Sequence, residues 1–363
     1  MHLLRERAAS VAGPGSTASG SVDLDPRTAG RLARQAVGEM GQGVAYGDKV
    51  VLQPREDELA LLLGARAAEH CPGNQRLNWK LNALVSANAR YCAVKIVGSN
   101  ACNLTLGLPR SQSQLLLYDK LTMTPVAQFD GTGLSARRTG AYASMAVDLL
   151  LAGRRRFSVR LYGAGPVAAC VLDDLRAHHA HRIRCVDVRS RRPDSAHAFA
   201  EAGSARTGLD VRAGHGEAEP ADLLITATNA ARPIVPLDAL HGDIAVLHLG
   251  GDELPAAFIE RALARGTVIC DDVKSVCHRN SQSLALYFSR QHLRLSELAA
   301  LFRIRSLHDG AMDDPSATSR PALMTCVGLP VLDLYLAQWL YEQRPGDADP
   351  VRGAAPDLLR VSD

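Results

Sequence analysis

The chain has 363 residues, enough for two domains with sizeable cores, and its 41 basic and 38 acidic residues leave a net charge of only +3. So small a surplus argues against nucleic-acid binding driven by phosphate contacts, and no apolar run approaches the ~20 residues of a membrane span. Hydrophobic residues make up 47% of the chain but aromatic ones only 4%, so alanine, leucine and valine must form most of the core.

Both ends of the chain have the composition of disordered segments. Residues 1–23 are rich in glycine, serine and alanine and lack the apolar core of a secretory signal, whereas residues 344–363 are rich in proline and aspartate. We therefore expect a disordered lead-in and a flexible tail. The eight cysteines form no CxxC pair, so the sequence predicts neither a metal site nor a disulfide framework and favours a reducing, cytoplasmic location.

The first folded segments combine a capped helix with strands. Asp25 and Pro26 predict a helix start, and Gly41 predicts its end. Residues 90–97 form a predicted strand in which Lys95 has apolar neighbours; such a lysine is either an ordinary edge residue or an amine placed for chemistry. Two more strands are expected, at residues 115–119 and 124–130.

A long helix is predicted from Leu134 into the second half of the chain, with Arg138 near its start. A cation at the start of a helix opposes the helix dipole, so it requires an anionic partner. A substrate carboxylate would supply that partner.

The strongest motif is an apolar strand beginning at Phe157 that ends in a glycine turn and continues with helical periodicity. Gly163 permits the tight turn, Gly165 lets the backbone approach a pyrophosphate, and Ala168 keeps the following helix packed on the strand. This context predicts a dinucleotide-binding domain. The turn consists of Gly163, Ala164, Gly165, Pro166, Val167 and Ala168.

The second strand of this domain, expected at residues 183–188, bears on the choice between NAD and NADP. Asp187 lies near its end, where an acidic residue normally binds the ribose hydroxyls of NAD and repels the extra phosphate of NADP. Arg189, Arg191 and Arg192 follow at once and would instead hold that phosphate. The sequence therefore favours NAD as cofactor and leaves NADP possible.

Further short strands alternate with helical stretches up to a last expected strand segment at residues 267–272. This alternation predicts a parallel sheet joined by right-handed crossovers. The expected fold class is α/β, with a Rossmann dinucleotide-binding domain over residues 151–309. The strand segments expected between the second and the last cover residues 209–212, 222–229 and 244–252.

A set of short segments occurs in an order and spacing that resemble the ornithine cyclodeaminase/mu-crystallin family. The resemblance covers roughly residues 52–342. It implies that residues 24–150 with 310–343 form an α/β domain that binds the substrate and joins two subunits into a homodimer. The segments are Lys95 with Gly98–Asn100, Asp130–Thr139, Gly163–Gly165, Ala221–Thr228 and Gly250–Asp252.

The resemblance also implies roles for single residues. Arg138 and Lys95 match residues that bind the substrate carboxylate, and Lys95 also lies beside the reacting carbon as a catalytic residue. Asp252 matches the catalytic aspartate that handles the amine and the hydrolytic water. Arg55 is a looser match to a second carboxylate-binding arginine, since its spacing to Lys95 differs. Cofactor contacts are expected at the glycine turn and at Thr139, Asp187, Arg189, Thr226, Ala227, Thr228 and Gly250.

Within the family, residues 97–100 and 107–111 resemble the siderophore and antibiotic branch, which includes N-(2-amino-2-carboxyethyl)-L-glutamate dehydrogenase. The glutamate that ornithine cyclodeaminases keep upstream of the lysine is missing near Leu81 and Asn82. The branch implies NAD-dependent oxidation of an amino-acid C–N bond to an imine, followed by hydrolysis to 2,3-diaminopropionate and 2-oxoglutarate. Alternatives are an ornithine or lysine cyclodeaminase that recycles NAD, and a cofactor-binding module of mu-crystallin type.

Overall fold

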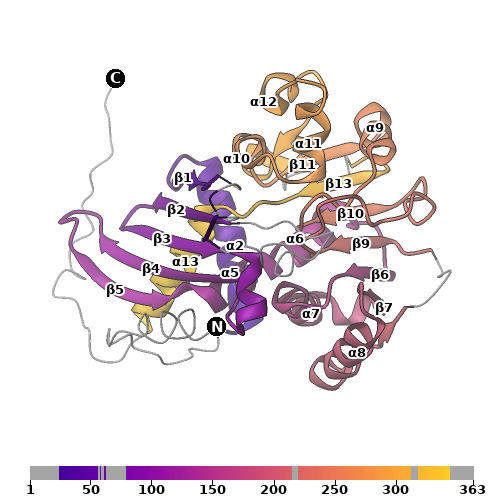
Figure 1. Cartoon of the computed structure of the whole chain (residues 1–363), viewed down its shortest axis with the longest axis horizontal. Coiled ribbons are helices and arrows are strands. Elements are labelled where there is room, and N and C mark those ends of the chain that lie inside the picture. The colour runs from indigo at the N-terminus through magenta and orange to yellow at the C-terminus, as the bar shows by residue number, and fades with distance from the viewer. Residues whose placement is uncertain are drawn as a thin grey trace.

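The fold is given by a computed structural model, which describes residues 24–55, 58, 61–62, 79–214, 220–311 and 318–343. The expected lead-in and tail lie outside these described residues. Within them, no helix is long and apolar enough to cross a membrane. Two sheets lie side by side, with helices packed against both (Figure 1).

The first sheet has five antiparallel strands that follow one another in chain order. Helix α13 (Pro330–Glu342) packs on one face of this sheet, and α2 (Pro26–Gly41) packs on α13 (Figure 1). The Asp25 carboxylate caps α2 by accepting a hydrogen bond from the Thr28 amide at 3.0 Å, which confirms the predicted helix. The strands are β1 (Tyr46–Leu52), β2 (Lys80–Ala87), β3 (Tyr91–Ser99), β4 (Ser111–Asp119) and β5 (Pro125–Asp130).

The second sheet has eight parallel strands, which confirms the predicted α/β class. They are β6 (Phe157–Tyr162), β7 (Ile183–Arg189), β8 (Val211–Ala213), β9 (Leu223–Thr226), β10 (Ala245–His248), β11 (Thr267–Cys270), β12 (Arg305–Ser306) and β13 (Ala322–Thr325). Their order across the sheet is β12-β11-β13-β10-β9-β6-β7-β8. The carboxyl ends of all these strands therefore meet at one edge.

Helices cover both faces of the parallel sheet, because its central strands are apolar on both sides. Leu223 and Ile225 belong to one hydrophobic core and Leu224 to another, as alternation along a strand requires. The first core includes α5 (Gly131–Gly140), α6 (Tyr142–Leu150), α7 (Pro166–His179) and α8 (Pro193–Thr207). The second includes α9 (Ala256–Arg265), α10 (Val273–Arg279), α11 (Ser283–Ser289) and α12 (Leu295–Leu298). Short helices are η2 (Ala101–Leu106), η3 (Ala180–Arg182) and η4 (Leu307–Ala311).

Two sequence expectations were wrong about the path of the chain. The parallel sheet does not end with β11, because β12 and β13 follow and β13 inserts between β11 and β10. The chain therefore returns to the first domain after Thr325, not at residue 310. A four-residue strand buried on both faces carries no alternation by which the sequence could distinguish it.

The predicted long helix from Leu134 is in fact two helices, α5 and α6. Asp130 caps α5 by accepting a hydrogen bond from the Thr132 amide at 2.9 Å, so the helix starts three residues early. Arg138 consequently lies in the last turn of α5, where the helix dipole favours a cation. The dipole is therefore not the reason why Arg138 needs an anionic partner.

Candidate functional site

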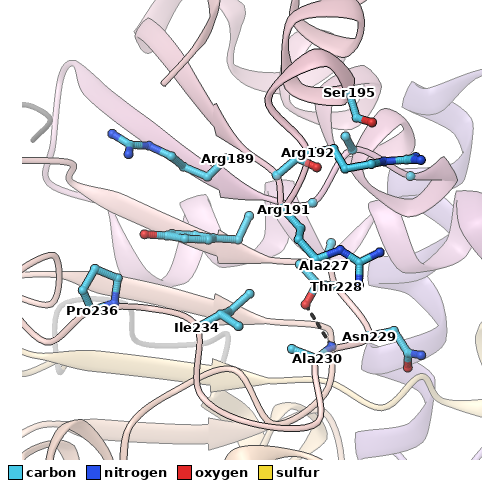
Figure 2. Close-up of a pocket in the computed structure, with 15 residues that line it drawn as sticks. Arg189, Arg191, Arg192, Ser195, Ala227, Thr228, Asn229, Ala230, Ile234 and Pro236 are labelled. Atoms are coloured by element: carbon cyan, nitrogen blue, oxygen red, sulfur yellow. Dashed lines mark hydrogen bonds between the residues drawn. The ribbon is translucent and has the colours of Figure 1, made fainter. Parts of the chain in front are cut away.

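A cleft of about 610 Å³ opens along the carboxyl edge of the parallel sheet (Figure 2). Its walls come from the turns that follow β6, β7 and β9, which is where open α/β sheets bind their ligands. The lining residues are Tyr162, Gly163, Ala164, Gly165, Arg189, Ser190, Arg191, Arg192, Ser195, Ala227, Thr228, Asn229, Ala230, Ile234 and Pro236.

The glycine turn between β6 and α7 has the shape that a dinucleotide requires. Gly163 has φ +123°, and a Cβ there would lie 2.7 Å from the Ala227 carbonyl oxygen, so only glycine fits. Gly165 is the N-cap of α7, and a Cβ there would meet nothing within 4 Å. The open space at Gly165 and the amides at the start of α7 therefore fit a pyrophosphate.

The predicted cofactor residues divide into two groups. Those that line the cleft are Gly163, Ala164, Gly165, Arg189, Ala227 and Thr228, whereas Thr139, Pro166, Val167, Ala168, Asp187, Thr226 and Gly250 are not among its lining residues. Ala168 and Thr226 are fully buried, and the Thr139 hydroxyl donates to the Ser135 carbonyl at 2.7 Å. Ala168 and Thr226 therefore belong to the core of the domain.

Asp187 has partners in the structure that the sequence did not predict. Its carboxylate accepts from Arg160 Nε, across the strand pair β6–β7, at 3.1 Å and from Arg189 Nε at 3.3 Å. A Cβ at Gly214 would lie 1.6 Å from Asp187 Oδ1, so this carboxylate packs against the segment after β8. The charge of Asp187 is thus compensated by two arginines, and its side chain is not among those that line the cleft.

A buried network that sequence analysis missed supports the cleft wall at Thr228. Glu253 accepts a hydrogen bond from the Thr228 amide at 2.7 Å, and His248 Nε2 lies 3.2 Å from its second oxygen. His248 Nδ1 lies 3.1 Å from the Thr325 hydroxyl, and all of these side chains except that of Thr228 are fully buried. The network fixes the cleft wall and the turn that carries Asp252 after β10. Its one signal in the sequence is the pair Asp252-Glu253.

A second cluster joins Lys95 and Arg138 through an aspartate on α13. Lys95 Nζ lies 2.7 Å from Asp333 Oδ1, and Arg138 Nε lies 3.4 Å from the same oxygen. Lys95 is only 2% exposed, and this burial lowers its pKa to about 8, against the opposing effect of the Asp333 charge and with a further contribution from Arg138. The cluster can therefore offer a neutral amine near physiological pH. Asp333 was missed, although it is the only acid within an apolar stretch of α13.

More cations surround this cluster. Lys49 and Lys95 lie on the same face of the antiparallel sheet, because both pair across the strands with Leu84. The pKa of Lys49 is lowered to about 6, mainly by burial and also by the charges of Arg279 and Arg138.

The acidic partner on the far side of Arg138 is Asp271, whose carboxylate accepts from the Gly328 amide at 2.7 Å and from the Tyr142 hydroxyl at 2.9 Å. Arg138 packs directly against Gly328, where a Cβ would lie 1.5 Å from its guanidinium. Because Gly328 follows β13 and Asp271 follows β11, the cluster continues the edge on which the cleft lies.

Polar atoms without partners lie on the same sheet face. Asn82 and Ser113 share one row of the sheet, two residues along from the row of Lys95. Among the described residues, Asn82 Oδ1, Ser113 Oγ and Asp333 Oδ2 are buried and have no hydrogen-bond partner. Buried polar atoms of this kind are normally paired, so they indicate a place for a polar ligand.

Two predicted site residues do not join this cluster. Arg55 has a side chain that is 75% exposed and pairs with Glu58 at 3.0 Å. Asp252 is fully buried at the end of β10 and its carboxylate pairs with Arg290, whose side chain is 57% exposed. The structure thus brings Lys95 and Arg138 together and leaves Asp252 one strand away, since β10 neighbours β13. Within the described residues, no group of His, Cys, Asp and Glu could hold a metal ion.

A parallel sheet with a glycine turn at its carboxyl edge, beside a second domain that carries buried cations, defines a two-domain protein of the Rossmann class. The sequence profile of the ornithine cyclodeaminase/mu-crystallin family matches residues 73–347, and the chain belongs to this family. The resemblance seen in the sequence is thereby confirmed.

The individual proteins that the chain resembles share about a quarter of its residues or fewer. The chain is 24% identical over 271 residues to an alanine dehydrogenase of Archaeoglobus fulgidus, covering 72% of this chain and 80% of that one. It is similar in structure to the Thermococcus litoralis Δ1-pyrroline-2-carboxylate reductase with NADH and L-proline, at 21% identity and TM-score 0.71 over 88% and 93% of the chains. It is also similar to an archaeal alanine dehydrogenase dimer with bound NAD, at 21% identity and TM-score 0.72 over 88% and 91%.

Proposed function

We propose that the chain is an enzyme that uses a nicotinamide dinucleotide, NAD or NADP, to oxidise the C–N bond of an amino acid to an imine, which water then hydrolyses. The observation that carries this proposal is the position of the Lys95–Arg138–Asp333 cluster at the end of β13, along the same sheet edge as the glycine turn. The dinucleotides bound to two similar structures support the choice of cofactor.

The reaction assigns distinct tasks to the chain's own residues. A bound dinucleotide would accept a hydride from the α-carbon, and the substrate nitrogen loses a proton as the C=N bond forms. Neutral Lys95 takes that proton, and Arg138 holds the substrate carboxylate through its guanidinium fork. Water then adds to the imine carbon and the C–N bond breaks, which leaves a keto acid and a free amine. Asp252, with one buried oxygen lacking a partner among the described residues, is the proposed proton shuttle for that step.

Our proposed substrate is N-(2-amino-2-carboxyethyl)-L-glutamate, which yields 2,3-diaminopropionate and 2-oxoglutarate. This compound carries several carboxylates, and the cluster has four basic side chains around it but only two acids. Bound carboxylates would pair with the two arginines, which would repel a cationic side chain, so the site favours this substrate over ornithine or lysine. The basic side chains are Lys49, Lys95, Arg138 and Arg279, and the acids are Asp271 and Asp333.

The proposal is tested by following reduced dinucleotide, 2-oxoglutarate and ammonia together after mixing the protein, NAD or NADP and candidate amino acids. We expect one reduced dinucleotide for each 2-oxoglutarate and no ammonia from the proposed substrate. Ammonia release from ornithine or lysine without net reduction would instead identify a cyclodeaminase. Binding of the dinucleotide with no product from any candidate would favour a binding module of mu-crystallin type.

We further propose that the chain forms a homodimer through the outer face of the antiparallel sheet. This face is apolar and uncovered in the single chain, and a contiguous apolar face of this kind normally marks an interface. The dimer of the similar alanine dehydrogenase supports the proposal. The exposed residues of the face, which pair across β1, β2 and β3, are Val50, Leu52, Leu81, Val85 and Ile96.

The interface is tested by light scattering at micromolar concentration. We expect a dimer mass for the natural chain and a monomer mass for Val85→Asp with Ile96→Asp, since paired carboxylates cannot be buried there. Leu301→Asp, which alters an exposed leucine away from this face, should leave the dimer intact. A monomer mass for the natural chain would contradict the proposal.

The proposed location of the protein is the cytoplasm. The seven cysteines of the described residues are free thiols, at positions 92, 102, 170, 185, 270, 277 and 326. Cytosolic thiols are kept reduced, so this state supports the proposal.

A further inference from the structure

The end of the cleft beside β7 is strongly basic. Arg189 is the last residue of this strand, and the turn that follows it places Arg191 and Arg192 on the cleft wall. Ser190 and Ser195 add two hydroxyl groups, the second from the first turn of α8. In Figure 2 the three arginine side chains extend in different directions from this one turn, above Thr228 and Ile234.

In a Rossmann domain this is where the adenosine ribose binds, because the second strand of the sheet ends there. An acidic side chain directed at the ribose binds its two hydroxyls, whereas an arginine there accommodates a 2′-phosphate. The only acid of this strand is Asp187, and its carboxylate is held by Arg160 and Arg189 within the sheet. Its charge is therefore compensated and does not oppose an incoming phosphate.

Two acidic residues near this end of the cleft do not outweigh the positive charge of its arginines. Asp194 follows Arg192 in the first turn of α8 and is exposed to solvent. Asp238 is not among the lining residues of the cleft, although its charge acts on the Tyr162 hydroxyl. Arg191 and Arg192 line the cleft from the turn that follows the strand.

We propose that Ser190, Arg191, Arg192 and Ser195 form a subsite for the 2′-phosphate of the dinucleotide, so that the chain binds NADP more tightly than NAD. Guanidinium groups pair two phosphate oxygens at once, and the hydroxyls donate to the third. This inference rests on the proposed dinucleotide cleft and decides between the two cofactors left open above.

The test is equilibrium binding of NADP and NAD to the full chain, by calorimetry, together with the fragments adenosine 2′,5′-bisphosphate and 5′-AMP. We expect NADP to bind about tenfold more tightly than NAD, and the bisphosphate about tenfold more tightly than 5′-AMP. A difference of this size corresponds to one added charge-assisted contact. The difference should shrink as salt is raised, since both arginines are exposed. Arg191→Ala with Arg192→Ala should remove the difference by weakening NADP binding much more than NAD binding.

Two further variants sharpen the test. Arg155→Ala removes an exposed arginine outside the cleft and should change neither affinity. Ser190→Asp places a carboxylate at the strand end and should invert the preference toward NAD.

Equal or tighter binding of NAD by the natural chain would overturn the inference while leaving the proposed function in place. Equal losses of NAD and NADP in the double arginine variant would also overturn it, because these arginines would then bind the shared pyrophosphate. If neither dinucleotide binds, the proposed function fails as well.

Discussion

Gly165→Val is expected to abolish binding of NAD and NADP while the chain still folds. Gly165 has φ −105° and ψ −175°, an extended conformation that valine adopts readily, and a Cβ there meets no atom within 4 Å. The added isopropyl group would therefore occupy the space reserved for the pyrophosphate. We expect the Kd for either dinucleotide to rise more than ~100-fold, with a loss of stability of at most about 1 kcal/mol from the changed N-cap.

Calorimetric binding and thermal unfolding followed by circular dichroism measure the two effects separately. Gly153→Val is the matched control, because Gly153 also has open space around its Cβ but does not line the cleft. It should bind both dinucleotides normally. Normal binding by Gly165→Val would show that the pyrophosphate does not sit on this turn.

The neighbouring glycine should behave in the opposite way. Gly163 adopts a positive φ, and a Cβ there would collide with the Ala227 carbonyl oxygen, so Gly163→Ala strains the fold itself. Loss of binding in that variant would follow from loss of structure. This difference is why Gly165 is the informative position for testing the cofactor site.

The sequence was most informative where function constrains the backbone directly. The Gly163–Ala168 turn lies between β6 and α7 as predicted, because strand, turn and helix are all local features. In contrast, β13 comes from a part of the chain remote from its neighbours β10 and β11, and four buried residues give no periodic signal. Local patterns thus identified the domain but missed one of its central strands.

The same distinction applies to the site. Lys95 and Arg138 were predicted together, but Asp333, which lies 238 residues after Lys95 and joins the two, depends on the return of α13 to the first domain. Asp187 was placed on the ribose because of its position near a strand end. Its pairing with Arg160 depends on the register between β6 and β7, which a single sequence does not reveal.

Lys95→Met is expected to lower kcat by about 10³-fold, in the range typical for loss of a general base. Methionine has nearly the same length but no amine, so the apolar surroundings of Lys95 should accept it. Because Lys95 does not line the cleft, dinucleotide affinity should stay unchanged. Turnover and calorimetric binding of the dinucleotide measure these two effects.

The pH dependence gives a sharper test. Burial lowers the pKa of Lys95 from 10.5 to about 8, so below pH 8 the amine is protonated and cannot accept a proton. We therefore expect kcat/KM in the natural protein to rise with pH and to level off above about pH 8. This rising limb of the pH profile should be absent in Lys95→Met. If Lys95→Met kept the limb, another group would be the base.

Asp333 should act through Lys95, so it is a positioning residue whose removal moves this limb. Its carboxylate, 2.7 Å from the amine, favours the charged form, while burial and Arg138 favour the neutral form. Asp333→Asn removes the only influence that raises the pKa, so the limb should move to lower pH; Asp333→Glu, which keeps the charge, should leave it near 8. A residue that only supported the fold would reduce activity at every pH alike. An unmoved limb in folded Asp333→Asn, checked by circular dichroism, would show that the ion pair does not set the proton affinity of Lys95.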